Sequence, residues 1–226
     1  MQSDKYAVIG KQWSGVAKPM IIKKEKLSES GQILDEAALC LFNFISDFSE
    51  IPLSESEKEH INLNLKVKTL RRGDYLLQEG DICRYHWFVV KGAIRMLSIN
   101  VSCREYVLAF RTENNWVTES ESLSQQSPSR YYIEAMERTQ VLQLNANCME
   151  TLRNDIPAWA EMLQKHEYEQ AIVTQRRINS VINMTAEERY RDMLISYPYY
   201  EQRFSQHMLA AYLGIQPETL CRIRKN

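Results

Sequence analysis

The chain has 226 residues, of which 44% are hydrophobic and 25% charged, and its formal net charge is -1 at pH 7. This composition is typical of a globular protein with room for two domains, and 7 glycines and 6 prolines leave little room for long disordered stretches. No apolar run is long enough to span a membrane, and the start lacks the apolar core of a signal peptide. We therefore expect a cytoplasmic protein.

The cysteines and histidines do not occur in a pattern that predicts a chemical site. The 5 cysteines are scattered and none forms a CxxC pair, so we expect reduced thiols and no metal site. The 4 histidines are isolated from one another, and no catalytic triad or phosphate-binding loop is evident. The sequence thus favours a protein that is not an enzyme.

The first part of the chain predicts a tail followed by two short helices. Residues 1–26 are rich in lysine and lack periodicity, so we expect a flexible tail. Apolar residues recur at helical spacing from Ile33 to Phe48, and the pattern resumes from Glu55 to Leu65 after a break at Ile51–Ser54.

Between residues 67 and 144 the pattern changes to short β-type runs separated by turns. The runs typical of strands are Tyr75–Leu77, Trp87–Val90, Ile94–Ile99, Tyr106–Phe110, Tyr131–Ala135 and Val141–Leu144. Turn signals such as Gly80-Asp81 and Lys91-Gly92 lie between them. This spacing predicts a small antiparallel roll or sandwich.

A single long helix is predicted from Asn154 to Asn183, with Asn154 or Asp155 as its N-cap and Pro157 in its first turn. One stripe on this helix keeps the spacing of a coiled-coil seam: Tyr168, Ala171, Gln175, Ile178 and Ile182. We interpret the stripe as a dimer interface. The alternative is a helix packed against its own roll, since the apolar positions shift upstream of the stripe.

Residues 206–223, QHMLAAYLGIQPETLCRI, have the pattern of a helix-turn-helix. Apolar residues occupy the positions that pack two helices together, and these are Leu209, Leu213, Ile215, Leu220 and Ile223. Ala210 is small enough for the helix crossing, Gly214 suits the turn, and Pro217 falls in the first turn of the second helix. The second helix is expected to enter the major groove of DNA.

Two side chains on that second helix predict base contacts. Glu218 can accept a hydrogen bond from cytosine N4, and Arg222 can donate two to guanine O6 and N7. Because they are four residues apart, they share one face. The alternative is an ordinary helical hairpin in which Glu218 and Arg222 form a surface ion pair.

From Leu34 to Asn226 the chain resembles the Crp/Fnr family of transcription regulators. The resemblance rests on the roll, the long helix, the helix-turn-helix and the spacing of Gly80-Asp81 and Gly92 around Trp87-Phe88-Val89. It implies an α+β fold in which an N-terminal antiparallel β-roll (a jelly-roll, cyclic-nucleotide-binding-like domain) is joined by a long dimerisation helix to a winged helix-turn-helix domain.

The resemblance divides the chain into four parts and implies its partners. The parts are a tail (1–26), a β-roll effector domain with leading helices (27–152), a dimerisation helix (153–183) and a helix-turn-helix domain (184–226). The expected partners are a second copy of the chain and near-palindromic double-stranded DNA, with RNA polymerase as a further candidate. Two half-sites would lie about 34 Å apart on one face of the duplex.

The predicted DNA-binding residues are Ser205, Gln206, Gln216, Glu218, Thr219, Arg222, Arg224 and Lys225. The second helix begins with Pro217 where the activator branch of the family has an arginine, so we expect a different operator. The sequence stops at Asn226, where further strands or a helix commonly follow, so some phosphate contacts of the family are expected to be missing.

The effector pocket departs further from the family pattern. Members that bind cyclic AMP hold its phosphate with a Gly-Glu pair and a later arginine, and alignment places Thr118, Glu119 and Ser129 at these positions. Only the glutamate matches. Arg130 is the nearest substitute, but on a strand it would point to the opposite face unless a local bulge turned it back. We therefore expect cyclic AMP to bind weakly or not at all, and the effector, if there is one, is unidentified.

One other class of function remains open from the sequence. A cyclic-nucleotide-binding-like module could signal through protein contacts without DNA. The complete helix-turn-helix pattern argues against this alternative, and failure of the chain to bind duplex DNA would favour it.

Overall fold

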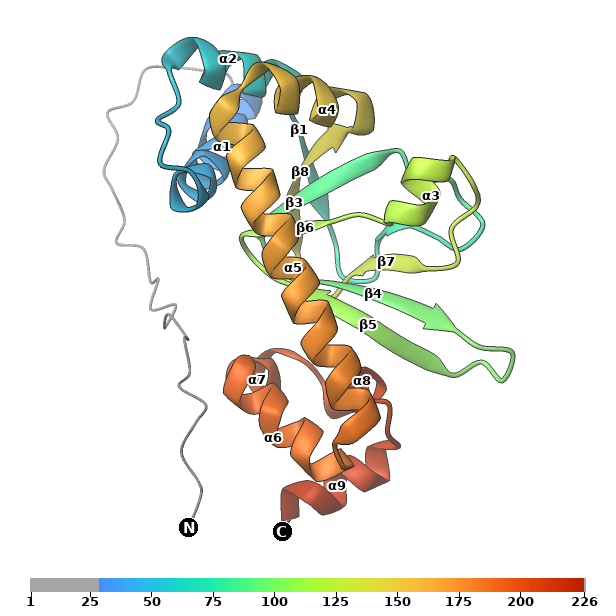
Figure 1. The fold of residues 1–226 in the computed structure, drawn as a ribbon. Coiled ribbons are helices and arrows are strands. Elements are labelled where there is room, and N and C mark those ends of the chain that lie inside the picture. The colour runs from blue at the N-terminus through green and yellow to red at the C-terminus, as the bar shows by residue number, and fades with distance from the viewer. Residues whose placement is uncertain (1–28, 226) are drawn as a thin grey trace, which may run out of the picture.

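A computed structural model describes residues 29–225, and every element below lies within them. The tail predicted for residues 1–26 and the terminal Asn226 lie outside the described residues. The chain forms a β-roll with leading helices, then one long helix that runs down to a group of short helices (Figure 1).

The helices of the effector domain and the long helix are α1 (Glu29–Phe48), α2 (Glu55–Asn64), α3 (Ser120–Gln125), α4 (Ala146–Asp155) and α5 (Pro157–Asn183). The C-terminal helices are α6 (Ala186–Ser196), α7 (Tyr200–Arg203), α8 (Gln206–Leu213) and α9 (Pro217–Lys225). The strands are β1 (Lys66–Leu70), β2 (Tyr75–Leu77), β3 (Tyr85–Lys91), β4 (Ile94–Ile99), β5 (Glu105–Arg111), β6 (Asn115–Val117), β7 (Tyr132–Ala135) and β8 (Thr139–Asn145).

The strands form two antiparallel sheets of four strands each, in the orders β1-β8-β3-β6 and β2-β7-β4-β5. This arrangement confirms the predicted antiparallel roll. Apolar side chains from both sheets fill the interior between them, and these include Val89, Ile94, Val117, Ile133 and Val141. Alternation along the strands sends the neighbouring residues to the outer faces, where helices cover them.

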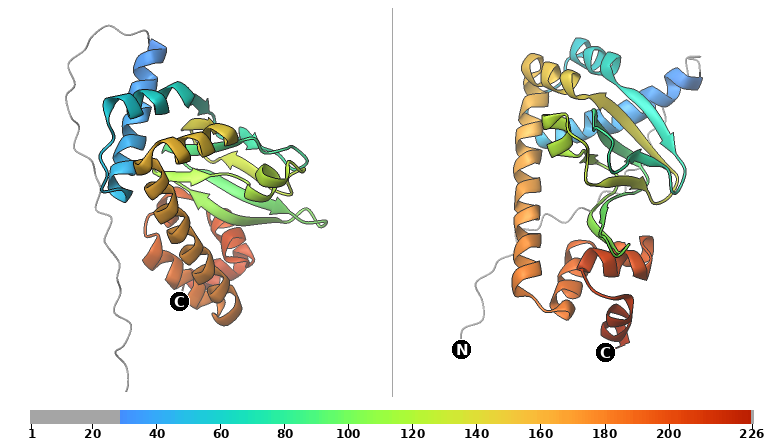
Figure 2. Two further views of the ribbon diagram at one scale, coloured as in Figure 1. Left: turned by 45° about the horizontal axis from the view of Figure 1, so that its top comes forward. Right: turned by 90° about the vertical axis from the view of Figure 1, so that its right-hand side faces the viewer.

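The outer face of the first sheet packs against α1, α4 and α5. Phe88 and Leu142 point outward from neighbouring strands and are completely buried, as are Leu41 and Ile45 of α1 and Trp159 of α5. Figure 2 shows α5 passing this layer and continuing to the C-terminal helices. The leading helices were predicted correctly, although α1 begins at Glu29 rather than Ile33.

The long helix begins later than the sequence predicted. Asn154 and Asp155 end α4, and α5 starts at Pro157 after Ile156, whose side chain cannot cap it. The prediction of Asn154 or Asp155 as N-cap was therefore wrong, whereas Pro157 does occupy the first turn. The missing backbone N–H of Pro157 does not destabilise α5, because an N–H in the first turn of a helix has no hydrogen-bond partner within that helix.

All the described elements between residues 184 and 225 are helices, so the wing expected of a winged domain does not lie within these residues. Their apolar core is continuous with the outer face of the second sheet. Phe110 of β5, for example, belongs to the same buried cluster as Tyr200, Phe204 and Leu209. The C-terminal helices therefore lie against the β-roll rather than apart from it (Figure 2).

Candidate nucleic-acid interface and effector site

The helix-turn-helix forms at α8 and α9 as the sequence predicts. Ser205 caps α8 by accepting a hydrogen bond from the backbone N–H of Met208, which has no partner within the helix. Gly214 ends α8 with a φ of 69°, a left-handed conformation that glycine adopts without steric cost. The second helix, α9, begins at Pro217.

The packing between the two helices confirms the role of the apolar positions. Leu209, Ala210 and Leu220 are at most 1% exposed, and Leu213 is also buried. Because Ala210 is fully buried, a larger side chain there would have to displace its packed neighbours. Ile215 and Ile223 pack against the same cluster while remaining partly exposed. The apolar side of α9 is thus packed against α8, and the opposite side of α9 faces outward.

That outward side carries most of the predicted DNA-binding residues. Gln216, Glu218, Arg222 and Lys225 are exposed, and Thr219 is partly exposed. The ion pairs among residues 29–225 include neither Glu218 nor Arg222. Both side chains are therefore free to contact a ligand, unlike in the alternative in which they pair with each other.

Two other predicted DNA-binding residues already have partners within the chain. The Nε of Arg224 lies 3.2 Å from Oε1 of Glu201, and the Gln206 side chain donates to the carbonyl of Pro217 at 3.3 Å. Glu201 also accepts a hydrogen bond from the hydroxyl of Tyr190. Burial and this bond to Glu201 raise the pKa of Tyr190 to about 12. Arg224 would have to leave this network in order to contact phosphate.

The residues aligned with the phosphate cassette bond to one another and to nearby backbone. The hydroxyl of Thr118 donates to the carbonyl of Tyr85 at 3.1 Å. Glu119 is 4% exposed, and its carboxylate caps α3 by accepting from backbone N–H groups of Glu121 and Ser122. Ser129 is also buried and forms a hydrogen bond with the backbone of Tyr131. The polar groups aligned with the family's anion site are therefore already satisfied.

Arg130 does not replace the missing arginine. It is exposed and pairs with Glu121 at 2.7 Å on the surface. Strand β7 begins only at Tyr132, so Arg130 precedes the strand on which the sequence analysis had placed it. The surface pairing nevertheless agrees with the expectation that Arg130 points away from the roll interior.

The seam predicted on α5 is exposed in the single chain. Tyr168, Ile178 and Ile182 are 69%, 54% and 72% exposed, and Ala171 and Gln175 are exposed as well. A neighbouring apolar residue that the sequence analysis did not select, Val181, is 57% exposed.

The first half of α5 packs against the roll of its own chain, which is the alternative to a dimer interface that the sequence left open. Trp159, Met162 and Leu163 are buried against the effector domain, together with His166. The helix therefore packs on its own roll upstream and leaves an apolar stripe uncovered downstream.

Two arginines that the sequence analysis did not select connect the parts of the molecule. Arg177 of α5 donates to the carbonyls of Val107, Leu108 and Tyr212 and stacks 4.0 Å from the centre of the Tyr212 ring. Arg203 of α7 pairs with carboxylates of the β-roll. No local sequence signal identifies Arg177, because its partners are distant backbone carbonyls.

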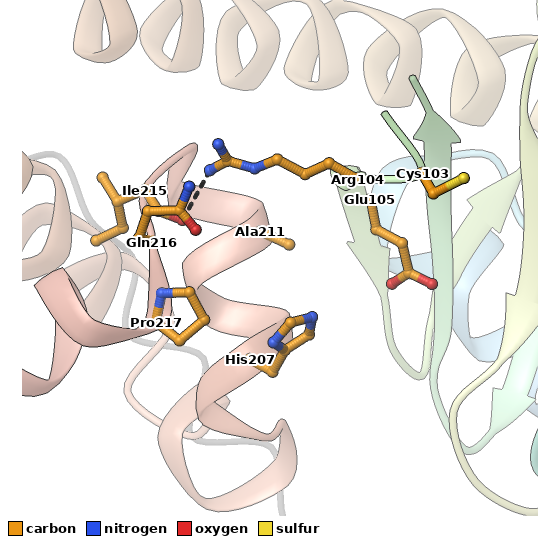
Figure 3. A pocket seen from close by; sticks show the side chains of 8 residues that line it. All are labelled: Cys103, Arg104, Glu105, His207, Ala211, Ile215, Gln216 and Pro217. Carbon is orange, nitrogen blue, oxygen red and sulfur yellow. Dashed lines mark hydrogen bonds between the residues drawn. The ribbon is translucent and has the colours of Figure 1, made fainter. Parts of the chain in front are cut away.

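A hollow of about 260 Å³ lies between the β4–β5 hairpin and the helix-turn-helix (Figure 3). Arg104 reaches across from the hairpin and donates to the carbonyl of Ile215 at 3.1 Å, in the turn before α9. His207 and Pro217 line the opposite side. The hairpin thus contacts the turn without covering the exposed face of α9.

Residues 29–225 contain no group of three or more side chains that could hold a metal ion. Among the same residues, no helix is both long and apolar enough to cross a membrane.

The chain is similar to known proteins in sequence and in fold. Residues 67–155 match the family model of the cyclic nucleotide-binding domain, and no curated protein matches the sequence. FixK2 from Bradyrhizobium japonicum is a similar solved structure, with a TM-score of 0.61, 19% identity and coverage of 71% of this chain and 83% of FixK2.

Two further solved structures have the same arrangement. The c-di-GMP-responsive regulator CLP from Xanthomonas campestris has a TM-score of 0.62 and 14% identity, covering 76% of this chain and 90% of CLP. A Eubacterium rectale protein described as a Crp/Fnr-family regulator has a TM-score of 0.58 and 18% identity, covering 76% and 82%. Residues 67–155 thus match the cyclic nucleotide-binding domain, and the chain has the fold of these solved structures, one of which is described as a Crp/Fnr-family regulator.

Proposed function

We propose that this chain is a sequence-specific, double-stranded DNA-binding transcription regulator of the Crp/Fnr type. The observation that carries the proposal is the outward face of α9, where Glu218 and Arg222 are exposed and unpaired with each other beside a correctly packed α8. Such a helix can enter the major groove, with Arg222 donating to a guanine edge and Lys225 near phosphate. In this account the chain is cytoplasmic and is not an enzyme.

The proposed functional division is the predicted one, with the first boundary moved to the end of α4. The residues up to Asp155 belong to the effector domain, α5 (Pro157–Asn183) is the dimerisation helix, and the helices after it belong to the DNA-binding domain. The exposed stripe of Tyr168, Ile178 and Ile182 supports a homodimer, because pairing two such stripes removes apolar surface from water. A two-fold dimer would read a near-palindromic site.

If the roll has an effector, we propose that it is a ligand other than cyclic AMP. The carboxylate of Glu119 caps α3, and Ser129 stands where the family has an arginine. An anionic phosphate bound at the aligned positions would therefore lack the arginine that pairs with it in the family. Related folds respond to different molecules, since CLP is described as responsive to c-di-GMP.

The proposal is tested by duplex binding of the full chain, measured by fluorescence anisotropy at several salt concentrations. Arg222→Ala should weaken binding to the preferred duplex by about 1–3 kcal/mol. The matched control is Arg191→Ala on α6, which removes an exposed arginine paired only with Glu187. Equal affinities for wild type and Arg222→Ala would contradict the role of Arg222, and absence of any duplex binding would contradict the proposal.

A further inference from the structure

The DNA-binding helices are docked on the effector domain through an extensive contact. Phe110 of β5 stacks on Phe204 with ring centroids 4.0 Å apart and planes 10° apart, and both side chains are buried. The Phe110 ring also meets the edge of Tyr200 at 5.4 Å. This apolar contact brings the two domains together, but flat aromatic faces alone leave rotation about the stack weakly defined.

Ion pairs beside the stack define the orientation. Two nitrogens of Arg203 donate to the two carboxylate oxygens of Glu113 at 2.7 and 2.6 Å, and one of them also donates to Glu137 at 2.7 Å. Such a bidentate pair fixes the angle as well as the distance between its partners. Glu113 is itself held, because its Oε1 accepts from the backbone N–H of Gly92 at 2.8 Å. Arg203 thus joins α7 to two loops of the β-roll, and Glu113 links one of these to a third loop at Gly92.

The charge state of this cluster is stable near neutral pH. Burial alone would raise the pKa of Glu113, but its hydrogen bonds, led by the one from Arg203, lower it below the ordinary value. The hydrogen bonds of Arg203 with Glu113 and Glu137 raise the pKa of the guanidinium. Both groups are therefore ionised under physiological conditions.

Arg177 makes a second link, from the long helix to α8. Its Nη2 donates to the carbonyl of Val107 at 2.7 Å and to the carbonyl of Tyr212 at 3.1 Å. One guanidinium therefore bonds the effector domain and the helix-turn-helix at once, while its own backbone belongs to α5. Because α5 carries the predicted dimer stripe, this contact relates the DNA-reading helix to the dimer axis.

We propose that Arg203 and Arg177 are positioning residues that fix the orientation of α9 relative to α5, so that two copies engage both half-sites of an operator together. The inference rests on the proposed function. The docked arrangement is compatible with binding, since it leaves Gln216, Glu218 and Arg222 exposed. Engagement of the second half-site is intramolecular, and its effective concentration falls when the geometry no longer matches the spacing.

The test compares a palindromic duplex with one in which a single half-site is replaced by unrelated sequence. Arg203→Gln and Arg177→Gln should each weaken palindrome binding by about tenfold. Affinity for the single half-site should stay within about twofold, because α8 and α9 are unchanged. The control Arg191→Gln should leave both affinities unchanged. Circular dichroism should be used to check that each variant is folded, and sedimentation to check that it keeps the oligomeric state of the wild type.

Further variants separate positioning from general stability. Arg203→Lys keeps the charge but loses the bidentate geometry, so its ratio of the two affinities should lie between those of wild type and Arg203→Gln. Replacing Glu113 and Glu137 by glutamine should reproduce the loss seen in Arg203→Gln, and adding Arg203→Gln should cause little further change. If Arg203→Gln and Arg177→Gln keep the ratio of the wild type, or lower both affinities equally, the inference is overturned. A wild type that binds no duplex would instead contradict the proposed function itself.

Discussion

The carboxylate of Glu119 accepts a hydrogen bond from the backbone N–H of Ser122 at 2.8 Å, and its other oxygen accepts one from the N–H of Glu121 at 3.0 Å. Glu119 is the cassette residue that matches the Crp/Fnr pattern, and here it caps α3. As the cap of α3, Glu119 uses both carboxylate oxygens to accept hydrogen bonds from the backbone of its own chain.

Glu119→Ala should therefore lower the free energy of unfolding by about 0.5–2 kcal/mol, because two N–H groups at the start of α3 lose their acceptor. Chemical denaturation monitored by fluorescence measures this change. Glu121→Ala is a suitable control, since Glu121 is exposed and pairs only with Arg130 on the surface. An equal effect of the two substitutions would argue against the cap.

Cyclic AMP should neither bind the chain tightly nor change its affinity for DNA. The roll interior is filled by apolar side chains such as Ile94 and Ile133, and the position of the family's arginine is held by the buried Ser129. Isothermal titration calorimetry should detect no heat of binding at micromolar ligand. Saturable binding with a matching rise in duplex affinity would show that the pocket opens and accepts the nucleotide.

The stability of the fold should fall as the pH is lowered from 7 to 5. Burial, with a smaller effect of a nearby arginine, lowers the pKa of both His86 and His166 to about 4. The unfolded chain, in which histidine has its ordinary pKa of about 6.5, therefore takes up protons first as the pH falls. Each histidine should cost about 1 to 2 kcal/mol across this window.

Urea denaturation at a series of pH values measures this slope. His166→Leu should make it shallower, because one of the two buried imidazoles is removed. The control His207→Leu replaces an exposed histidine and keeps both buried imidazoles. A stability that is constant between pH 7 and 5 would contradict the assignment.

Replacing Ile178 and Ile182 together with aspartate should dissociate the proposed dimer, because each carboxylate would be buried in the seam. Analytical ultracentrifugation gives the change directly, as a shift from dimer to monomer. The matched control is Asn179→Asp with Asn183→Asp, which places the same charges on α5 outside the predicted stripe. Dimers that persist in the Ile178 and Ile182 variant would place the interface on another surface.

The sequence predicted best those parts whose steric requirements are local. In the helix-turn-helix, the helix crossing demands a small residue at Ala210 and the turn demands a left-handed conformation at Gly214, and both are found. The strands with apolar alternation were also located. Strands β1 and β6 were missed. Strand β1 exposes Lys66 and Lys68 instead of alternating apolar residues, and β6 begins with the polar Asn115 and has only two apolar residues.

The parts that depend on contacts between distant segments could not be predicted. The break between α4 and α5 lies at Ile156, where a residue buried in the core ends one helix and precedes the next. The docking of the C-terminal helices rests on Phe110 meeting Phe204 and on Arg177 bonding backbone carbonyls, and neither leaves a pattern in the sequence. Glu119 matched the family motif, but its role as a helix cap required the structure.

We propose that this chain reads a near-palindromic DNA sequence as a dimer. The most direct test is selection of bound duplexes from a random library by the full chain at a stated salt concentration. The account predicts enrichment of two inverted half-sites with centres about one helical turn, or 34 Å, apart. No enrichment over the starting library at any salt concentration would contradict it, and it would favour a module that signals through protein contacts alone.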